Sequence, residues 1–199
     1  NAGSIEASAS AYLGFATGVS ITSPTDVLAY NSGDISANLE ATYGWATGMD
    51  IDSDGGIGIY NDGSISATSD AYAFGIWIDT DTHGFIYNTG TIEAAGGKYS
   101  VAITSTGYSS DAIYNYGTIT GSIWTWDNND FLYNGEGGEW NAIEASYFGD
   151  GDDEILNYGT INMSDAAIYM GTYSEYGNGF LNAGTITVSG DNLIDMGGG

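Results

Sequence analysis

Polar and apolar residues alternate around seven isoleucines that recur along the chain. Each isoleucine is flanked by polar or hydroxylic residues, as in Asp34-Ile35-Ser36. Alternation with a period of two puts one residue on a buried face and its neighbours on an exposed face, which predicts a β-strand. Helical repeats would need apolar residues three and four apart, and 32 glycines would weaken helices. The isoleucines are Ile5, Ile35, Ile65, Ile92, Ile119, Ile161 and Ile186.

Each isoleucine lies four residues after an asparagine, within the pattern Asn-x-Gly-x-Ile. We predict that Asn-x-Gly forms a corner between strands, because glycine adopts positive φ without strain and asparagine tolerates the same region. Stacked corners would place the asparagines in a hydrogen-bonded ladder along the stack. The corner residues are Asn1, Asn31, Asn61, Asn88, Asn115, Asn157 and Asn182, with Gly3, Gly33, Gly63, Gly90, Gly117, Gly159 and Gly184.

One copy of the pattern, at 133–143, is irregular. Two extra residues follow Asn134, so Gly138 is predicted to take the glycine position and Trp140 the isoleucine position. With Asn134 included, successive asparagines are 30, 30, 27, 27, 19, 23 and 25 residues apart. We interpret the region near 121–143 as a shortened coil with a bulge inside one repeat array, not as a domain boundary.

Each repeat also carries a second strand-like run after the corner and a third that leads to the next asparagine. Two or three short strands in a repeat of roughly 20–30 residues are typical of a β-helix coil, whereas a propeller blade has four strands in about 40–50 residues. The sequence therefore predicts an all-β fold, a right-handed parallel β-helix (β-solenoid) of about seven to eight coils of roughly 19–30 residues. It forms a single domain over residues 1–199.

A row of tyrosines occupies the position before the asparagine. If the apolar residue before each tyrosine points inward, the tyrosines point outward and stack from coil to coil. Such a row either stabilises the stack through aromatic pairing or offers a surface to sugars or a neighbouring chain. The row consists of Tyr30, Tyr60, Tyr87, Tyr114 and Tyr133, and it is interrupted at Leu156 and Leu181.

The charge balance excludes several classes of partner. The chain has 26 acidic residues against one basic residue, Lys98, and a formal net charge of −25. Nothing offsets the charge of phosphates, so nucleic acids and anionic membrane surfaces are excluded as partners. No stretch is long and apolar enough for membrane insertion, and there is no cysteine. We expect a secreted or cell-surface, extracellular protein, whose chain is a processed mature form or a cut fragment.

Two acidic clusters are candidates for binding Ca²⁺, which takes six to eight oxygen ligands in flexible loops. One contains Asp50, Asp52 and Asp54, and the other contains Asp150, Asp152, Asp153 and Glu154. The second cluster matches half of the Ca²⁺-binding nonapeptide pattern, which requires tandem copies. The alternative is that both clusters are solvated acidic loops, so calcium is a possible rather than a required cofactor.

We do not expect an enzyme. Lyases acting on acidic sugars need cationic groups, and this chain has no arginine and one lysine. A hydrolase with two carboxylates is compatible with the composition, but the abundance of acids singles out no pair. The one histidine, His83, lies in a stretch whose composition predicts a solvated loop.

The copies YNTGTI, YNYGTI and LNAGTI, and the segment GDGDDEILNYGTI at 149–161, resemble the β-strand repeats of bacterial autotransporter passengers and related surface adhesins. The resemblance extends over nearly the whole chain. It implies secretion, a parallel β-helix, and a role in adhesion, matrix formation or surface display. It does not identify a ligand, because such repeats are scaffolds.

Neither end of the repeat array carries an evident polar cap, and an open coil is a sheet edge that can pair with another. A heterologous end-to-end contact of this kind produces an open filament. Our hypothesis is an extracellular structural protein that assembles with itself, head to tail, into a filament or fibre. The alternatives are a segment of an adhesin that binds glycans or cell surfaces and, third, a carbohydrate-active enzyme.

Overall fold

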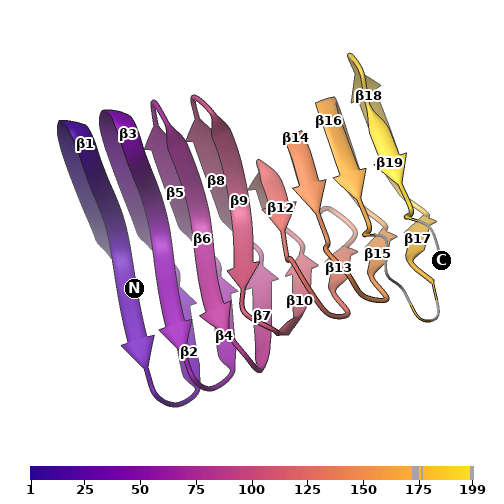
Figure 1. The fold of residues 1–199 in the computed structure, drawn as a ribbon, viewed down its shortest axis with the longest axis horizontal. Helices are drawn as coiled ribbons and strands as arrows, with labels where there is room; N and C mark the ends of the chain where they lie inside the picture. Colours follow the sequence, from indigo (N-terminus) through magenta and orange to yellow (C-terminus); the bar gives the residue numbers. More distant parts are fainter. Residues whose placement is uncertain (172–174, 176, 198–199) are drawn as a thin grey trace.

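The computed structural model describes residues 1–171, 175 and 177–197. Within these residues every strand pairing is parallel and the strands stack into a β-solenoid of about seven turns, which confirms the predicted fold class. The strands follow one another along the stack in sequence order, from the indigo end to the yellow end (Figure 1). The described residues contain no helix that is long and apolar enough to cross a membrane.

Two parallel sheets enclose the core. The longer sheet has 12 strands and the shorter has seven. The strands of the long sheet are β1 (Ser4–Ser23), β3 (Asp34–Ser53), β5 (Ser64–Ser69), β6 (Tyr72–Thr80), β8 (Thr91–Gly96), β9 (Tyr99–Thr106), β11 (Thr118–Thr120), β12 (Ser122–Trp124), β14 (Glu139–Tyr147), β16 (Thr160–Tyr169), β18 (Thr185–Ser189) and β19 (Leu193–Asp195). Those of the short sheet are β2 (Val27–Asn31), β4 (Ile57–Asn61), β7 (His83–Asn88), β10 (Ser110–Asn115), β13 (Phe131–Asn134), β15 (Glu154–Asn157) and β17 (Gly179–Asn182).

A turn of the solenoid runs from a short-sheet strand through the Asn-x-Gly corner into the long sheet, and then back. In the first two turns the long-sheet part is one continuous strand of 20 residues, where the sequence predicts shorter strands. In later turns the same path is divided, since β3 pairs with β5 along its first part and with β6 along its second part. The predicted isoleucine column is in register, with Ile35 beside Ile5 and Ile65.

The core has an isoleucine-rich part and a narrow alanine-rich part. The isoleucines of the repeat pack with residues from both sheets. The alanines lie where the two parts of the long sheet approach each other, for example Ala37 on β3 and Ala73 on β6. Small side chains allow this close approach. The alanine cluster contains no residue after Ala94, and the path between β11 and β12 is reduced to the single residue Gly121.

The irregular copy keeps all three repeat positions. Trp140 pairs in register with Ile119 and Ile161 and is fully buried, and its Nε1 donates to the Gly121 carbonyl at 3.0 Å. The backbone N–H of Thr160 donates to the Gly138 carbonyl. In the other coils the carbonyl of the corner glycine accepts an equivalent N–H from the next turn. The two additional residues form a turn at 136–137. Trp140 therefore replaces isoleucine where the coil shortens and the alanine-rich part of the core ends.

The predicted reason for the corner glycines is wrong. None of Gly33, Gly63, Gly90, Gly117, Gly159 and Gly184 has a positive φ angle. A Cβ atom at each of them would instead overlap backbone atoms of the preceding turn, chiefly the carbonyl oxygen of the preceding corner glycine or, at Gly159, that of Gly138. Glycine is needed because adjacent turns stack backbone on backbone at this corner.

Candidate functional site

The asparagine ladder passes through every turn as a chain of side-chain hydrogen bonds. Nδ2 of each asparagine donates to Oδ1 of the asparagine in the next turn, at 2.7–3.1 Å. Nδ2 of Asn61, for example, also lies within hydrogen-bonding distance of the carbonyls of Gly63 and Thr91. The amides at Asn61, Asn88, Asn115, Asn134 and Asn157 are fully buried. The ladder satisfies buried polar groups inside the corner, so its role is structural.

The tyrosine row lies on the outer face of the short sheet, as the alternation predicts. Tyr30 stacks on Tyr60 with ring centroids 4.9 Å apart and an angle of 15° between the planes. Further along, Tyr114 and Tyr133 lie 6.0 Å apart at 38°. Each ring packs against a ring of a neighbouring turn, although Tyr30 at the first turn remains exposed. This geometry favours stabilisation of the stack over stacking on sugar rings.

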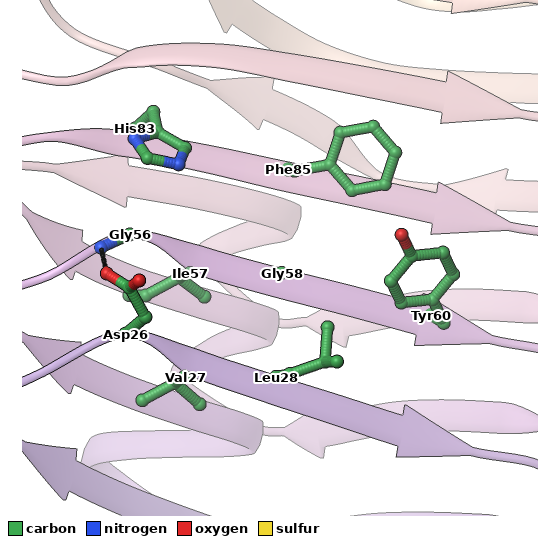
Figure 2. A pocket seen from close by; sticks show the side chains of 9 residues that line it. All are labelled: Asp26, Val27, Leu28, Gly56, Ile57, Gly58, Tyr60, His83 and Phe85. Carbon is green, nitrogen blue, oxygen red and sulfur yellow. Dashed lines mark hydrogen bonds between the residues drawn. The ribbon is translucent and has the colours of Figure 1, made fainter.

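A small pocket interrupts this aromatic face near its first strands (Figure 2). Its floor is formed by β4 and the residue before it, because Gly58 and Gly56 carry no side chain. The walls come from the neighbouring strands, with Leu28 on one side and Phe85 on the other, and Tyr60 lies at one end. The cavity volume is about 290 Å³. A Cβ at Gly58 would lie 3.0 Å from Cδ1 of Leu28, so a larger residue there would fill the pocket.

The polar end of the pocket is formed by His83 and Asp26. His83 is the first residue of β7 and not part of a loop, which corrects the prediction from composition. Its exposed ring lies over Gly56, whose backbone N–H donates to Oδ1 of Asp26 at 2.8 Å (Figure 2). An imidazole and a carboxylate beside apolar walls could hold a small ligand that has both polar and apolar faces.

A column of buried carboxylates runs along the other corner of the solenoid, and sequence reasoning missed it. The backbone N–H of Asp111 donates to Oδ1 of Asp130 at 2.8 Å, and that of Asp130 donates to Oδ1 of Asp153 at 2.9 Å. The N–H of Asp153 donates to Oδ1 of Asn178 at 2.8 Å. The sequence does contain a signal for this column, because each of the four residues lies four positions before an asparagine of the ladder.

Asp130 and Asp153 are buried, and no cationic side chain among the described residues offsets the charge of either carboxyl group. Asp130 and Asp153 are at most 2% exposed, and their Oδ2 atoms make no hydrogen bond within the described structure. Burial, together with the charge of Asp111, raises the pKa of Asp130 to about 9. Burial raises the pKa of Asp153 to about 7 and also raises that of Asp111. The chain's single basic side chain, Lys98, lies over the rings of Tyr43 and Tyr72 instead.

The candidate calcium ligands at 150–154 point in different directions. Asp153 is directed into the core column, whereas Glu154 is exposed on the short sheet. Asp150 is exposed and lines a second pocket, and Oδ1 of Asp152 accepts the N–H of Gly177. The carboxylates of this cluster therefore do not converge on one point where they could bind a common Ca²⁺ ion.

The cluster at 50–54 lies on and beside β3. Asp50 and Asp52 are two residues apart on its outer face, Asp79 pairs with Asp52 from β6, and Asp54 follows the strand in a turn. The pKa of Asp50 is raised by partial burial and then by repulsion from Asp52 and Asp79. In the part of the chain that the structure describes, no group of three or more His, Cys, Asp or Glu residues is arranged to hold a metal ion.

Fold and site together define the class of this protein as a parallel β-solenoid with internal asparagine and carboxylate columns and an aromatic outer face. Comparisons with protein families, with curated proteins and with solved structures found no match to the chain. Its function is therefore inferred from its own residues.

Proposed function

We propose that this chain is an extracellular structural protein, the subunit of a filament or matrix fibre in which β-solenoids join head to tail. The observation that carries the proposal is the direction of the asparagine ladder. In every link the earlier asparagine donates and the later one accepts. Oδ1 of Asn1 accepts the N–H of Gly3 at 3.0 Å. Its second lone pair corresponds to the one with which each later asparagine accepts the Nδ2 donor of the preceding turn. Nδ2 of Asn182 in a second copy is the matching donor.

The apolar core supports the same mode of assembly. Residues of the first and last turns, such as Ile5 and Ile186, are partly exposed, whereas Ile65 and Ile92 in the middle are fully buried. A second solenoid stacked in register would bury these residues and pair the backbone groups of both end strands. Because one face donates where the other accepts, the contact is heterologous and produces an open filament.

The acidic surface and the repeat pattern support the proposed location. A net charge of −25 keeps single chains apart at low ionic strength, and salt or divalent cations would screen this repulsion. Extracellular fluids supply such conditions. The resemblance of the repeats to those of autotransporter passengers and surface adhesins is consistent with secretion and display on the cell surface.

Gly3→Ala tests the proposal without altering the interior of the solenoid. The one atom near a Cβ at Gly3 is Oδ1 of Asn1, 3.9 Å away, so we expect the variant to fold normally. In a filament, that Cβ would meet the backbone of the incoming turn, as it would at Gly33 or Gly63. At high ionic strength and high concentration, the unmodified chain should form rods, with a repeat of roughly 35 Å from about seven turns of 4.8 Å. Gly3→Ala should remain monomeric.

Sedimentation velocity and electron microscopy, with and without millimolar Ca²⁺, provide the measurement. If the unmodified chain stays monomeric under all these conditions, the filament proposal is wrong. Assembly that proceeds equally well in Gly3→Ala would show that the contact is not a continuation of the solenoid.

The pocket beside His83 favours an adhesin segment as the second candidate function. Its volume and its mixture of apolar and polar walls suit one ring of a neutral glycan. If this is the function, immobilised neutral polysaccharide should retain the chain, and Gly58→Leu should reduce retention about tenfold or more by filling the pocket. Gly179→Leu is the matched control, because Gly179 lies in the same outward column on β17 and a Cβ there makes only ordinary contacts with Glu154 and Asp153. Retention that is unchanged in Gly58→Leu would argue against this site.

A further inference from the structure

A second pocket, of about 390 Å³, lies where the chain passes from the long sheet to the short sheet, at the same corner as the carboxylate column. Its aromatic lining consists of Trp126, Tyr147 and Tyr169. Tyr147 and Tyr169 are the last residues of β14 and β16, two strands that lie side by side (Figure 1). The two tyrosine rings stack with centroids 5.2 Å apart and an angle of 9° between their planes. The remaining lining residues are Gly149, Asp150 and Gly171.

The backbone keeps this pocket open. Gly149 and Gly171 have φ angles of +75° and +83°, and a Cβ at either position would overlap the carbonyl of the turn before it. Trp126 precedes them in the same column and has a φ angle of +43°. A bulky residue rarely adopts this left-handed conformation, and strained residues cluster at functional sites. Trp126 remains 51% exposed, so burial does not explain why a tryptophan occupies this position.

The negative charge at the pocket favours a cationic ligand. Asp150 is the charged residue in the lining, and Asp127 pairs with it in a β-bridge from the preceding turn. The face of an aromatic ring attracts cations through the ring quadrupole, and a nearby carboxylate adds to this attraction. An anionic ligand would be repelled both here and by the protein as a whole. A glycan would find few polar partners, because the exposed lining of the pocket is almost entirely apolar.

We propose that the pocket formed by Trp126, Tyr147, Tyr169 and Asp150 binds an organic cation of the quaternary ammonium class. The methyl groups of such a ligand would pack on the aromatic side chains, and the carboxylates of Asp150 and of the neighbouring Asp127 would favour its positive charge. Such a ligand carries apolar methyl groups on a permanent positive charge, which matches both features of the lining. The inference is independent of end-to-end assembly, because none of the pocket residues belongs to the first or last turn of the described solenoid.

Isothermal titration of the whole chain with choline chloride tests the proposal, with the neutral isostere 3,3-dimethylbutan-1-ol and methyl β-glucoside as comparison ligands. We expect choline to bind about tenfold more tightly than either comparison ligand. Trp126→Gly should reduce choline affinity about tenfold or more. This variant should fold well, because the equivalent residues of the next turns are glycines. Asp150→Asn should weaken choline binding about fivefold at low ionic strength, and by less at high salt. Tyr30→Leu should change nothing.

Three results would overturn the inference. They are equal or tighter binding of the neutral isostere or the glucoside, choline affinity that is unchanged in a folded Trp126→Gly variant, and no detectable heat with choline at millimolar concentration. A thermal unfolding curve for each variant separates loss of the pocket from loss of the fold.

Discussion

Gly90→Ala is expected to destabilise the solenoid by about 3 kcal/mol or more, at the upper end of the cost of overpacking. A Cβ at Gly90 would overlap the carbonyl oxygen of Gly63 in the preceding turn. Neither backbone segment can move away easily, because the Gly63 carbonyl accepts the N–H of Thr91 at 2.8 Å and the Gly90 carbonyl accepts that of Thr118 at 2.9 Å. Urea unfolding followed by far-ultraviolet circular dichroism measures the loss.

Gly3→Ala is the matched control for this prediction, since it makes the same chemical change at the same repeat position. No turn packs against Gly3 from outside, so its cost should be within about 0.5 kcal/mol, as for a surface substitution. If the two variants lose similar stability as monomers, the overlap between turns is not the reason for the glycine. The cost would then come from the local conformation of the corner.

Asp130→Asn is expected to raise the stability of the chain at pH 8 by about 2 kcal/mol or more while leaving it nearly unchanged near pH 3. The pKa of Asp130 is raised from 3.8 to about 9 in the folded state, chiefly by burial and then by the charge of Asp111. Between these two values the folded chain binds more protons than the unfolded chain, so its stability falls as pH rises. Asparagine keeps the Oδ1 acceptor for the N–H of Asp111 and removes the ionisation. An asparagine already does this later in the same column, where Oδ1 of Asn178 accepts the N–H of Asp153.

Urea midpoints measured from pH 3 to pH 9 test the prediction. The unmodified chain should lose stability across this range, and Asp130→Asn should make the slope shallower. Asp111 and Asp153, whose pKa values are also raised, should account for part of the remaining slope. The exposed Asp34→Asn serves as a control for the change in net charge. An equal pH slope in Asp130→Asn and in the unmodified chain would contradict a neutral carboxyl group in the core.

The sequence by itself determined the class of fold and the positions of the repeat. Alternation around Ile35 and its equivalents, with the Asn-x-Gly pattern at a period of 19–30 residues, is sufficient to predict a stack of β-coils. The same periodicity placed Gly138 and Trp140 correctly, because each turn must align with the turns on either side of it. Local pattern and period are properties of the chain that need no knowledge of distant contacts.

The tertiary structure decided why particular residues are required. It showed that position 90 requires glycine because the backbones of two turns touch there, and not because φ is positive. That contact exists only when two turns stack. It showed that Asp153, a candidate calcium ligand, is a buried carboxylate that accepts the N–H of Asp130, because its side chain faces the core just before β15 begins. It also brought Trp126, Tyr147 and Tyr169 together from three turns. Contacts between turns depend on register and side-chain direction, which the spacing of residues along the chain does not contain.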